Sequence, residues 1–154
     1  MLTDIEKQEI DQEIPKYETT QAVSIEALKI VQRNRRWIND EAIRDVSTYL
    51  GITAEDLESV ATFYNLIFRK PVGRHVILIC NSITCWVMGY EHLLDHIKNT
   101  LGIGLGETTP DGRFTLLPTV CLGICDHSPA VMIDDDTHVD LDNASFDAIL
   151  AQYT

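Results

Sequence analysis

The sequence contains no apolar run that approaches the roughly 18 residues required by a membrane-spanning helix. Its longest apolar stretches, such as Val76-Ile77-Leu78-Ile79-Cys80, have the length of a buried strand. The first ten residues are polar and acidic, so they lack the apolar stretch of a secretory signal peptide. We therefore expect a protein that is neither exported nor inserted directly into a membrane.

Lysine and arginine are scarce in the second half of the chain. Residues 75–154 hold two of them against eleven Asp or Glu, a formal charge of −9, whereas residues 1–74 hold ten against thirteen. A nucleic-acid-binding surface would require a basic face, so the composition argues against a nucleic-acid partner.

The first seventy residues predict a bundle of four short amphipathic helices. Expected helix starts are Thr3 with Glu6, Ser24, Asn39 or Asp40, and Thr53 with Asp56; expected stops are Pro15, about Arg33, and Gly51. In the last helix, Leu57, Val60, Ala61 and Tyr64 are expected to face the core. Arg33, Arg35, Arg36 and Trp37 form a basic and aromatic cluster, which suits either a helix end or a docking patch for another subunit.

Proline and glycine in residues 69–73 indicate a boundary between two domains, 1–72 and 73–154. The second domain predicts the order β-α-β-β-β-α. Strands are expected at 75–80, 114–120, 130–133 and 138–141, and helices at 89–101 and, capped by Asn143, as far as Tyr153. The fold class is therefore α+β, a helical bundle followed by a two-layer α/β domain.

Cysteine is also scarce, and its four copies form two short pairs, Cys80 with Cys85 and Cys121 with Cys125. Disulfides rarely persist in the reducing compartment expected for this chain, so cysteine pairs point to metal or redox chemistry. Both pairs are expected in loops at strand ends, where a sheet can bring distant segments together. The chain has no Cys-x-x-Cys active site for dithiol exchange.

The spacings leave two kinds of site open. Structural zinc commonly pairs cysteines two to four residues apart, so these spacings lie at the looser edge of zinc sites. A 2Fe-2S cluster takes two thiolates at each iron, and a Cys-x4-Cys spacing recurs in plant-type ferredoxins. Cys125-Asp126-His127 contains half of a Rieske-type pattern, but neither Cys80 nor Cys85 is followed by a matching histidine.

The sequence also resembles a known family, the thioredoxin-like 2Fe-2S ferredoxin subunit (the E subunit) of bacterial NADH:quinone oxidoreductase, respiratory complex I. The resemblance covers about residues 20–154. It rests on the two cysteine pairs, Asp111-Gly112-Arg113-Phe114, Ser24-Ile25-Glu26-Ala27-Leu28, Val60-Ala61-Thr62-Phe63-Tyr64 and Pro71-Val72-Gly73. One departure is Ser128-Pro129, where many relatives carry Ala-Pro, outside the ligand positions.

The resemblance implies a thioredoxin-like second domain and one 2Fe-2S cluster, with Cys80 and Cys85 holding one iron and Cys121 and Cys125 the other. It implies an electron-transfer subunit of an oxidoreductase, with no catalytic site of its own. The cluster would accept an electron from FMN on a partner flavoprotein subunit that also binds NADH, and the large iron-sulfur subunit is a further expected partner. The expected location is the cytoplasm, peripheral to the inner membrane through the complex.

Two alternatives stay open beside this interpretation. Similar subunits serve NAD-linked formate dehydrogenases and NAD-reducing hydrogenases, and a zinc-stabilised interaction module is the alternative of a different class. The acidic surroundings of the cysteines, including Asp126 beside Cys125, favour a cluster of low reduction potential, because reduction adds negative charge.

Overall fold

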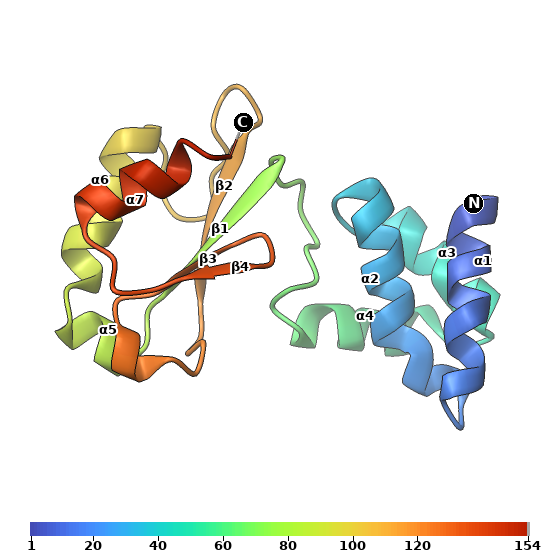
Figure 1. Ribbon diagram of the computed structural model, residues 1–154. Coiled ribbons are helices and arrows are strands. Elements are labelled where there is room, and N and C mark those ends of the chain that lie inside the picture. Colours follow the sequence, from blue (N-terminus) through green and yellow to red (C-terminus); the bar gives the residue numbers. More distant parts are fainter. Residues whose placement is uncertain (154) are drawn as a thin grey trace. The chain divides into compact units, whose positions relative to one another are not determined.

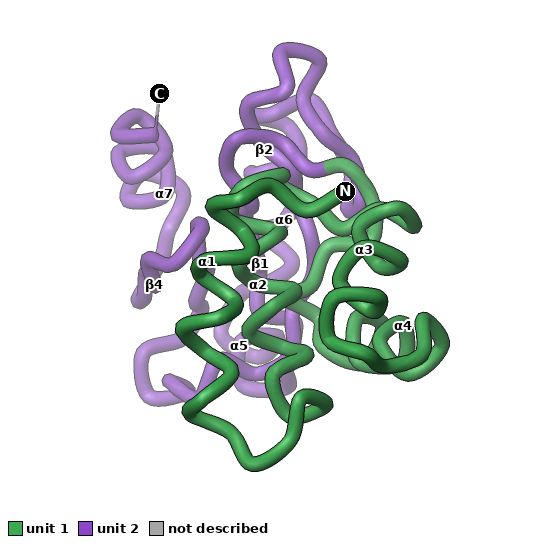
Figure 2. Tube along the Cα trace, turned by 90° about the vertical axis from the view of Figure 1, so that its right-hand side faces the viewer, with its two compact units in different colours: residues 1–71 green, residues 72–154 purple. Residues whose placement is uncertain are grey.

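The computed structural model describes residues 1–153. The chain divides into two compact units, one of residues 1–71 and one that begins at Val72 (Figure 2). That the chain consists of two independent domains, 1–72 and 73–154, remains a proposal. Among the described residues, no helix is long and apolar enough to cross a membrane.

Four helices build the first unit: α1 (Asp4–Glu13), α2 (Ser24–Arg35), α3 (Asp40–Leu50) and α4 (Ala54–Phe63). Two short 3-10 turns, Ile14–Lys16 and Thr20–Val23, connect α1 to α2, and these two helices lie side by side (Figure 1). The apolar faces of the four helices enclose a core, to which the connection between α2 and α3 adds Ile38. The core includes Ile10, Leu28, Val31, Val46 and Leu57. The expected helical bundle is confirmed.

Side chains cap the helices of this unit largely where the sequence predicts. The Thr3 hydroxyl accepts a hydrogen bond from the Glu6 amide at 3.2 Å, and the Glu6 carboxylate accepts one from the Thr3 amide at 2.7 Å. Asn39 caps α3, and Thr53 caps α4 by accepting from the Asp56 amide at 3.1 Å. These caps satisfy amides that have no partner within the helix.

The C-terminal end of α4 differs from the prediction. Leu57 and Ala61 are buried as expected, but Tyr64 is 42 % exposed, so the expectation that it faces the core is wrong. Tyr64 follows the last helical residue and has an extended backbone, which carries its side chain off the helical face. The neighbouring Phe63 is 80 % exposed.

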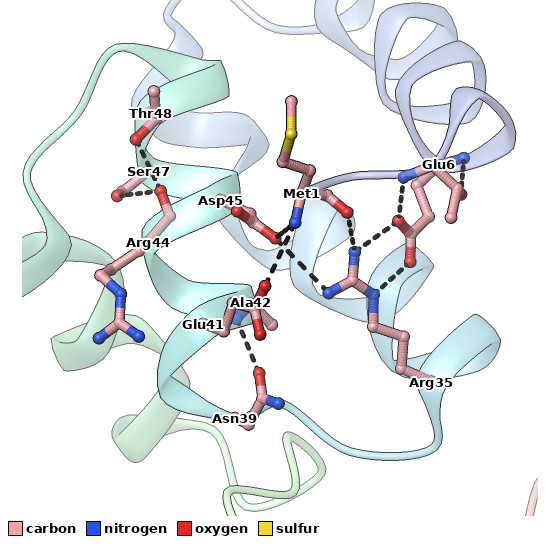
Figure 3. Close-up of polar contacts among 11 residues, drawn as sticks. Met1, Glu6, Arg35, Asn39, Glu41, Ala42, Arg44, Asp45, Ser47 and Thr48 are labelled. Atoms are coloured by element: carbon pink, nitrogen blue, oxygen red, sulfur yellow. Dashed lines mark hydrogen bonds and ion pairs between the residues drawn. The ribbon is translucent and has the colours of Figure 1, made fainter.

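Internal ion pairs engage two arginines of the basic cluster at the end of α2. Arg33 lies 3.0 Å from Glu9 of α1, and Arg35 points toward Glu6 and Asp45 (Figure 3). Arg35 is therefore part of the packing of unit 1, which argues against its use as a docking residue.

A four-stranded mixed sheet with the strand order β2-β1-β3-β4 forms the centre of the second unit. β1 (His75–Cys80) pairs in parallel with β2 (Phe114–Thr119) and antiparallel with β3 (Val131–Ile133), and β3 pairs antiparallel with β4 (Asp136–His138). Two parallel neighbouring strands must be joined by a long crossover connection, which is usually helical. Between β1 and β2, this connection contains α5 (Ile83–Val87) and α6 (Tyr90–Leu101).

Helices α6 and α7 (Asn143–Leu150) pack with the sheet around a common core (Figure 1). Leu93, Ile97 and Phe146 from the helices meet Ile77, Leu116 and Ile133 from the strands, and all of them are buried. The α+β fold class is confirmed, with a sheet and a helical layer in the second unit.

The predicted boundaries of two elements near the C-terminus are wrong. The strand expected at 138–141 lies at Asp136–His138, because Ile133 pairs directly with Asp136 across a tight turn in which Asp134 has a φ of 52°. Asp142, not Asn143, caps α7 by accepting from the Ser145 amide, and the helix ends at Leu150. Short-range caps and turns compete at adjacent polar residues, and packing selects among them.

Candidate iron-sulfur site

The parallel pairing of β1 and β2 brings the two cysteine pairs to the same edge of the sheet. Cys80 is the last residue of β1 and lies opposite Thr119, the last residue of β2, so Cys121 follows closely at the same edge. The Asn81 amide donates to the Thr119 carbonyl at 3.1 Å, and the Cys80 amide donates to the Ala130 carbonyl at 3.1 Å. Segments about 40 residues apart in the sequence thus meet here, as parallel strand ends do in α/β sheets.

The expectation that both cysteine pairs lie in loops is wrong in part. Cys80 belongs to β1, Cys85 to α5, and Cys125 begins a 3-10 turn (Cys125–His127); Cys121 lies in a loop. The chain closes a helical turn directly after β1, with the Trp86 amide donating to the Ser82 carbonyl at 2.9 Å. This turn carries Cys85 back toward the strand end.

One cysteine pair is buried and the other is exposed. Cys80 and Cys85 are 2 % and 3 % exposed, whereas Cys121 and Cys125 are both exposed, with their Sγ atoms 3.4 Å apart. The pairs also interact with each other, Cys121 with Cys80 and Cys125 with Cys85. Among the described residues, no three His, Cys, Asp or Glu side chains form a group suited to a single metal ion. The contacts within and between the two pairs nevertheless place the four thiols close together.

The surroundings shift the pKa values of these thiols in different directions. Burial raises the pKa of Cys80, although the Ser82 and Leu122 amides oppose the shift. The Gly123 amide, 3.4 Å from the Cys121 sulfur, lowers the pKa of Cys121. The hydrogen-bonded Cys121 neighbour raises the pKa of Cys125. Loading a metal centre requires thiolates, and the amides that face Cys80 and Cys121 favour this charged form.

Polar groups surround the sulfur atoms, and none of these contacts was predicted from the sequence. The Ser82 and Thr84 hydroxyls interact with Cys121 and Cys125 respectively, and the Ser128 hydroxyl lies 3.5 Å from the Cys85 sulfur. The sequence does contain a signal for Gly123. A glycine between two cysteines indicates a turn with positive φ, and its φ is 84°. No sequence signal marks Ser128, whose distance to Cys85 depends on the fold.

The polar partners of His127 are carboxylates rather than the cysteine sulfurs. Its Nδ1 lies 2.8 Å from an Asp140 carboxylate oxygen, and its Nε2 lies 3.6 Å from Asp126. The Asp140 carboxylate raises the pKa of His127. The geometry gives no support to the Rieske-type alternative, in which His127 would be an iron ligand.

The donor set fits a 2Fe-2S cluster. Four thiols from two segments lie close together, they are paired two by two, and backbone amides and side-chain hydroxyls contact the sulfurs. Thiolates are the ligands that such clusters use, and donors of this kind stabilise the negative charge that a cluster adds.

Comparison with known proteins agrees with this geometry. The family model of the thioredoxin-like [2Fe-2S] ferredoxins matches residues 10–154. The chain belongs to this family. Membership confirms the family that the cysteine pairs and the flanking motifs indicate, and it supports an iron-sulfur cluster.

Close relatives within the family share one name, the E subunit of NADH-quinone oxidoreductase. The chain is 55 % identical over 141 residues to the E subunit of Pseudomonas aeruginosa, covering 92 % of this chain and 85 % of the relative. It is 50 % identical over 152 residues to the E subunit of Escherichia coli K12, covering 99 % and 92 %. The similarity therefore extends over both units.

A solved structure is also similar over much of the chain. A chain of an NAD⁺-reducing [NiFe]-hydrogenase in the air-oxidized state superimposes with a TM-score of 0.70 and 25 % sequence identity. The match covers 82 % of this chain but 22 % of the hydrogenase chain. The fold thus occurs as part of a longer chain in that enzyme.

Proposed function

We propose that this protein is the electron-transfer subunit of the NADH dehydrogenase module of an NADH-quinone oxidoreductase. The observation that supports it is the convergence of two cysteine pairs at adjacent ends of β1 and β2, in a chain about half identical to the E subunits of two bacterial enzymes. The cluster that these residues would hold takes up and releases one electron.

In this proposal, each cysteine pair holds one iron. Cys80 and Cys85 would bind the iron on the buried side, and Cys121 and Cys125 the iron on the exposed side. The exposed pair lies where a partner can approach, which suits electron entry from outside the chain. The acidic domain would keep the reduction potential low, because reduction adds negative charge to a half of the chain that already carries −9.

The electron donor would be the FMN of a flavoprotein subunit that also binds NADH. The large iron-sulfur subunit of the same module is the second proposed partner. The protein would then lie in the cytoplasm and associate with the inner membrane through these subunits. The similarity to the NAD⁺-reducing hydrogenase supports a second candidate, an equivalent role in an NAD⁺-reducing hydrogenase.

Anaerobic purification of the full chain tests the cofactor. We expect a coloured protein with two irons and two acid-labile sulfides per chain. Stoichiometric zinc without sulfide would instead support the zinc-stabilised interaction module and contradict the proposal. Affinity capture from the native host then distinguishes the assemblies: co-purification with a quinone-reducing membrane complex supports the proposal, and co-purification with a hydrogenase or formate dehydrogenase supports the alternative.

A further inference from the structure

Ser128 is a buried residue that touches both halves of the sulfur site. It is 7 % exposed, and its Oγ lies 3.5 Å from the Cys85 sulfur. The same oxygen donates to the Cys125 carbonyl at 2.9 Å. The hydroxyl therefore lies between α5, which carries Cys85, and the turn that begins at Cys125.

The protonation state of Cys85 determines which group donates the hydrogen bond between Ser128 and Cys85. A Cys85 thiol can donate its hydrogen to the Ser128 oxygen, but an iron-bound Cys85 is a thiolate and has no hydrogen to give. The remaining hydrogen belongs to the Ser128 hydroxyl. Between a neutral carbonyl and a thiolate that both lie within reach, the charged sulfur attracts it more strongly.

The other three sulfurs already have donors of their own. The Ser82 and Leu122 amides face Cys80, and the Gly123 amide faces Cys121. The Thr84 hydroxyl interacts with Cys125. Ser128 completes this set at Cys85, which is 3 % exposed and thus shielded from water that could replace the hydroxyl.

We propose that the Ser128 hydroxyl donates a hydrogen bond to the Cys85 thiolate in the cluster-loaded protein and raises the reduction potential of the cluster. Donors to sulfur stabilise the more negative, reduced state, and the effect is larger at a buried sulfur because the surroundings have a low dielectric constant. Ser128 thus offsets part of the decrease in reduction potential that the acidic surroundings cause. The inference rests on the proposed function through the assignment of Cys85 as a ligand.

The test is an EPR-monitored redox titration of the cluster-loaded full chain and its variants. Ser128→Ala removes the hydroxyl, and we expect the equilibrium constant for electron uptake to fall by up to about tenfold, a shift of ~59 mV to more negative potential. Ser128→Thr keeps a hydroxyl and should restore the potential toward the wild-type value. Iron and sulfide contents should be the same in all loaded variants.

Ser47→Ala is the matched control. Ser47 is 5 % exposed, and its hydroxyl donates at 3.0 Å to the Arg44 carbonyl three residues earlier, as Ser128 does to Cys125. Ser47 lies in the helical unit, so its loss should leave the potential unchanged.

The outcomes separate this inference from the proposed function. A loaded Ser128→Ala variant with the wild-type potential overturns the role of Ser128 and leaves the ligand assignment intact. If that variant does not load, Ser128→Gly removes the same hydroxyl, and a wild-type potential in it overturns the inference equally. A wild-type chain without iron and sulfide would instead contradict the proposed function.

Discussion

Arg35 holds both carboxylate oxygens of Glu6 across 29 residues of sequence. Its Nε lies 2.7 Å from Oε1 and its Nη2 lies 2.8 Å from Oε2, while a third contact reaches Asp45 at 3.6 Å (Figure 3). Glu6 has no exposed surface, because Arg35, itself about one quarter exposed, covers it. The pair fastens α2 to α1, and the same carboxylate caps α1 through the Thr3 amide.

Breaking this ion pair should destabilise the helical unit. Arg35→Met keeps an apolar stem but leaves the Glu6 carboxylate buried without its cation, so we expect a loss of about 3 kcal/mol in the free energy of unfolding. Urea unfolding monitored by circular dichroism measures this change. Arg33→Met is the control, because Arg33 pairs with Glu9 but is 67 % exposed, and its loss should cost less than about 1 kcal/mol.

The same carboxylate should make stability depend on pH. Burial alone would raise the pKa of Glu6, but the hydrogen bonds from Arg35 and the Thr3 amide bring it below its ordinary value of 4.5. A group with a lowered folded pKa stabilises the fold above its unfolded pKa, and this contribution disappears as the pH falls through the folded value.

Urea unfolding of the wild type and Glu6→Gln at several pH values tests this dependence. The wild type should be more stable by a constant amount above about pH 5.5, and the difference should shrink as the pH falls below about 4.5. A difference that stays constant down to pH 3 would show that the carboxylate charge does not matter.

Gly73 should resist substitution because backbone surrounds it. A Cβ at this position would lie 3.0 Å from the Gly112 carbonyl oxygen and 3.0 Å from the Phe114 carbonyl carbon, at the start of the β1 and β2 pairing. We expect Gly73→Ala to lower the free energy of unfolding by about 1–3 kcal/mol.

Gly104→Ala is the matched control for Gly73. A Cβ at Gly104 would meet only the flexible Glu107 side chain, at 3.3 Å. In thermal unfolding, Gly73→Ala should show a clear loss of stability and Gly104→Ala little change. Equal losses of stability in the two variants would contradict the steric explanation.

Loss of a cysteine should remove the cluster without unfolding the helical unit. Cys80→Ser removes one thiolate from the first proposed iron site, and Cys121→Ser removes one from the second. In either variant, most of the EPR signal of the reduced cluster should disappear or change. If residues 1–72 form a separate domain, as we propose, the helical circular dichroism of this part should persist. An unchanged EPR spectrum in either variant would refute the assignment of that residue as a ligand.

Local sequence signals predicted many of the elements because short-range physics decides them. Thr3 and Glu6 can reach each other within one helical turn, and Asn39 and Thr53 need only the amides three residues ahead. The apolar run at His75–Cys80 likewise predicted a buried strand. Predictions were wrong where neighbouring polar residues compete, as with Asp142 and Asn143, and at Tyr64, where the helix ends.

The sequence by itself determined the fold class, the four cysteines as the candidate ligands and, through its motifs, the family. Only the tertiary structure decided how these residues meet. The parallel pairing of β1 with β2 places Cys80 and Cys121 at one edge, and the packing around α5 buries Cys85 against Ser128. The packing of α1 against α2 likewise places Arg35 beside Glu6, 29 residues away in the sequence. Such contacts depend on the packing of segments distant in the chain, which residue spacing does not encode.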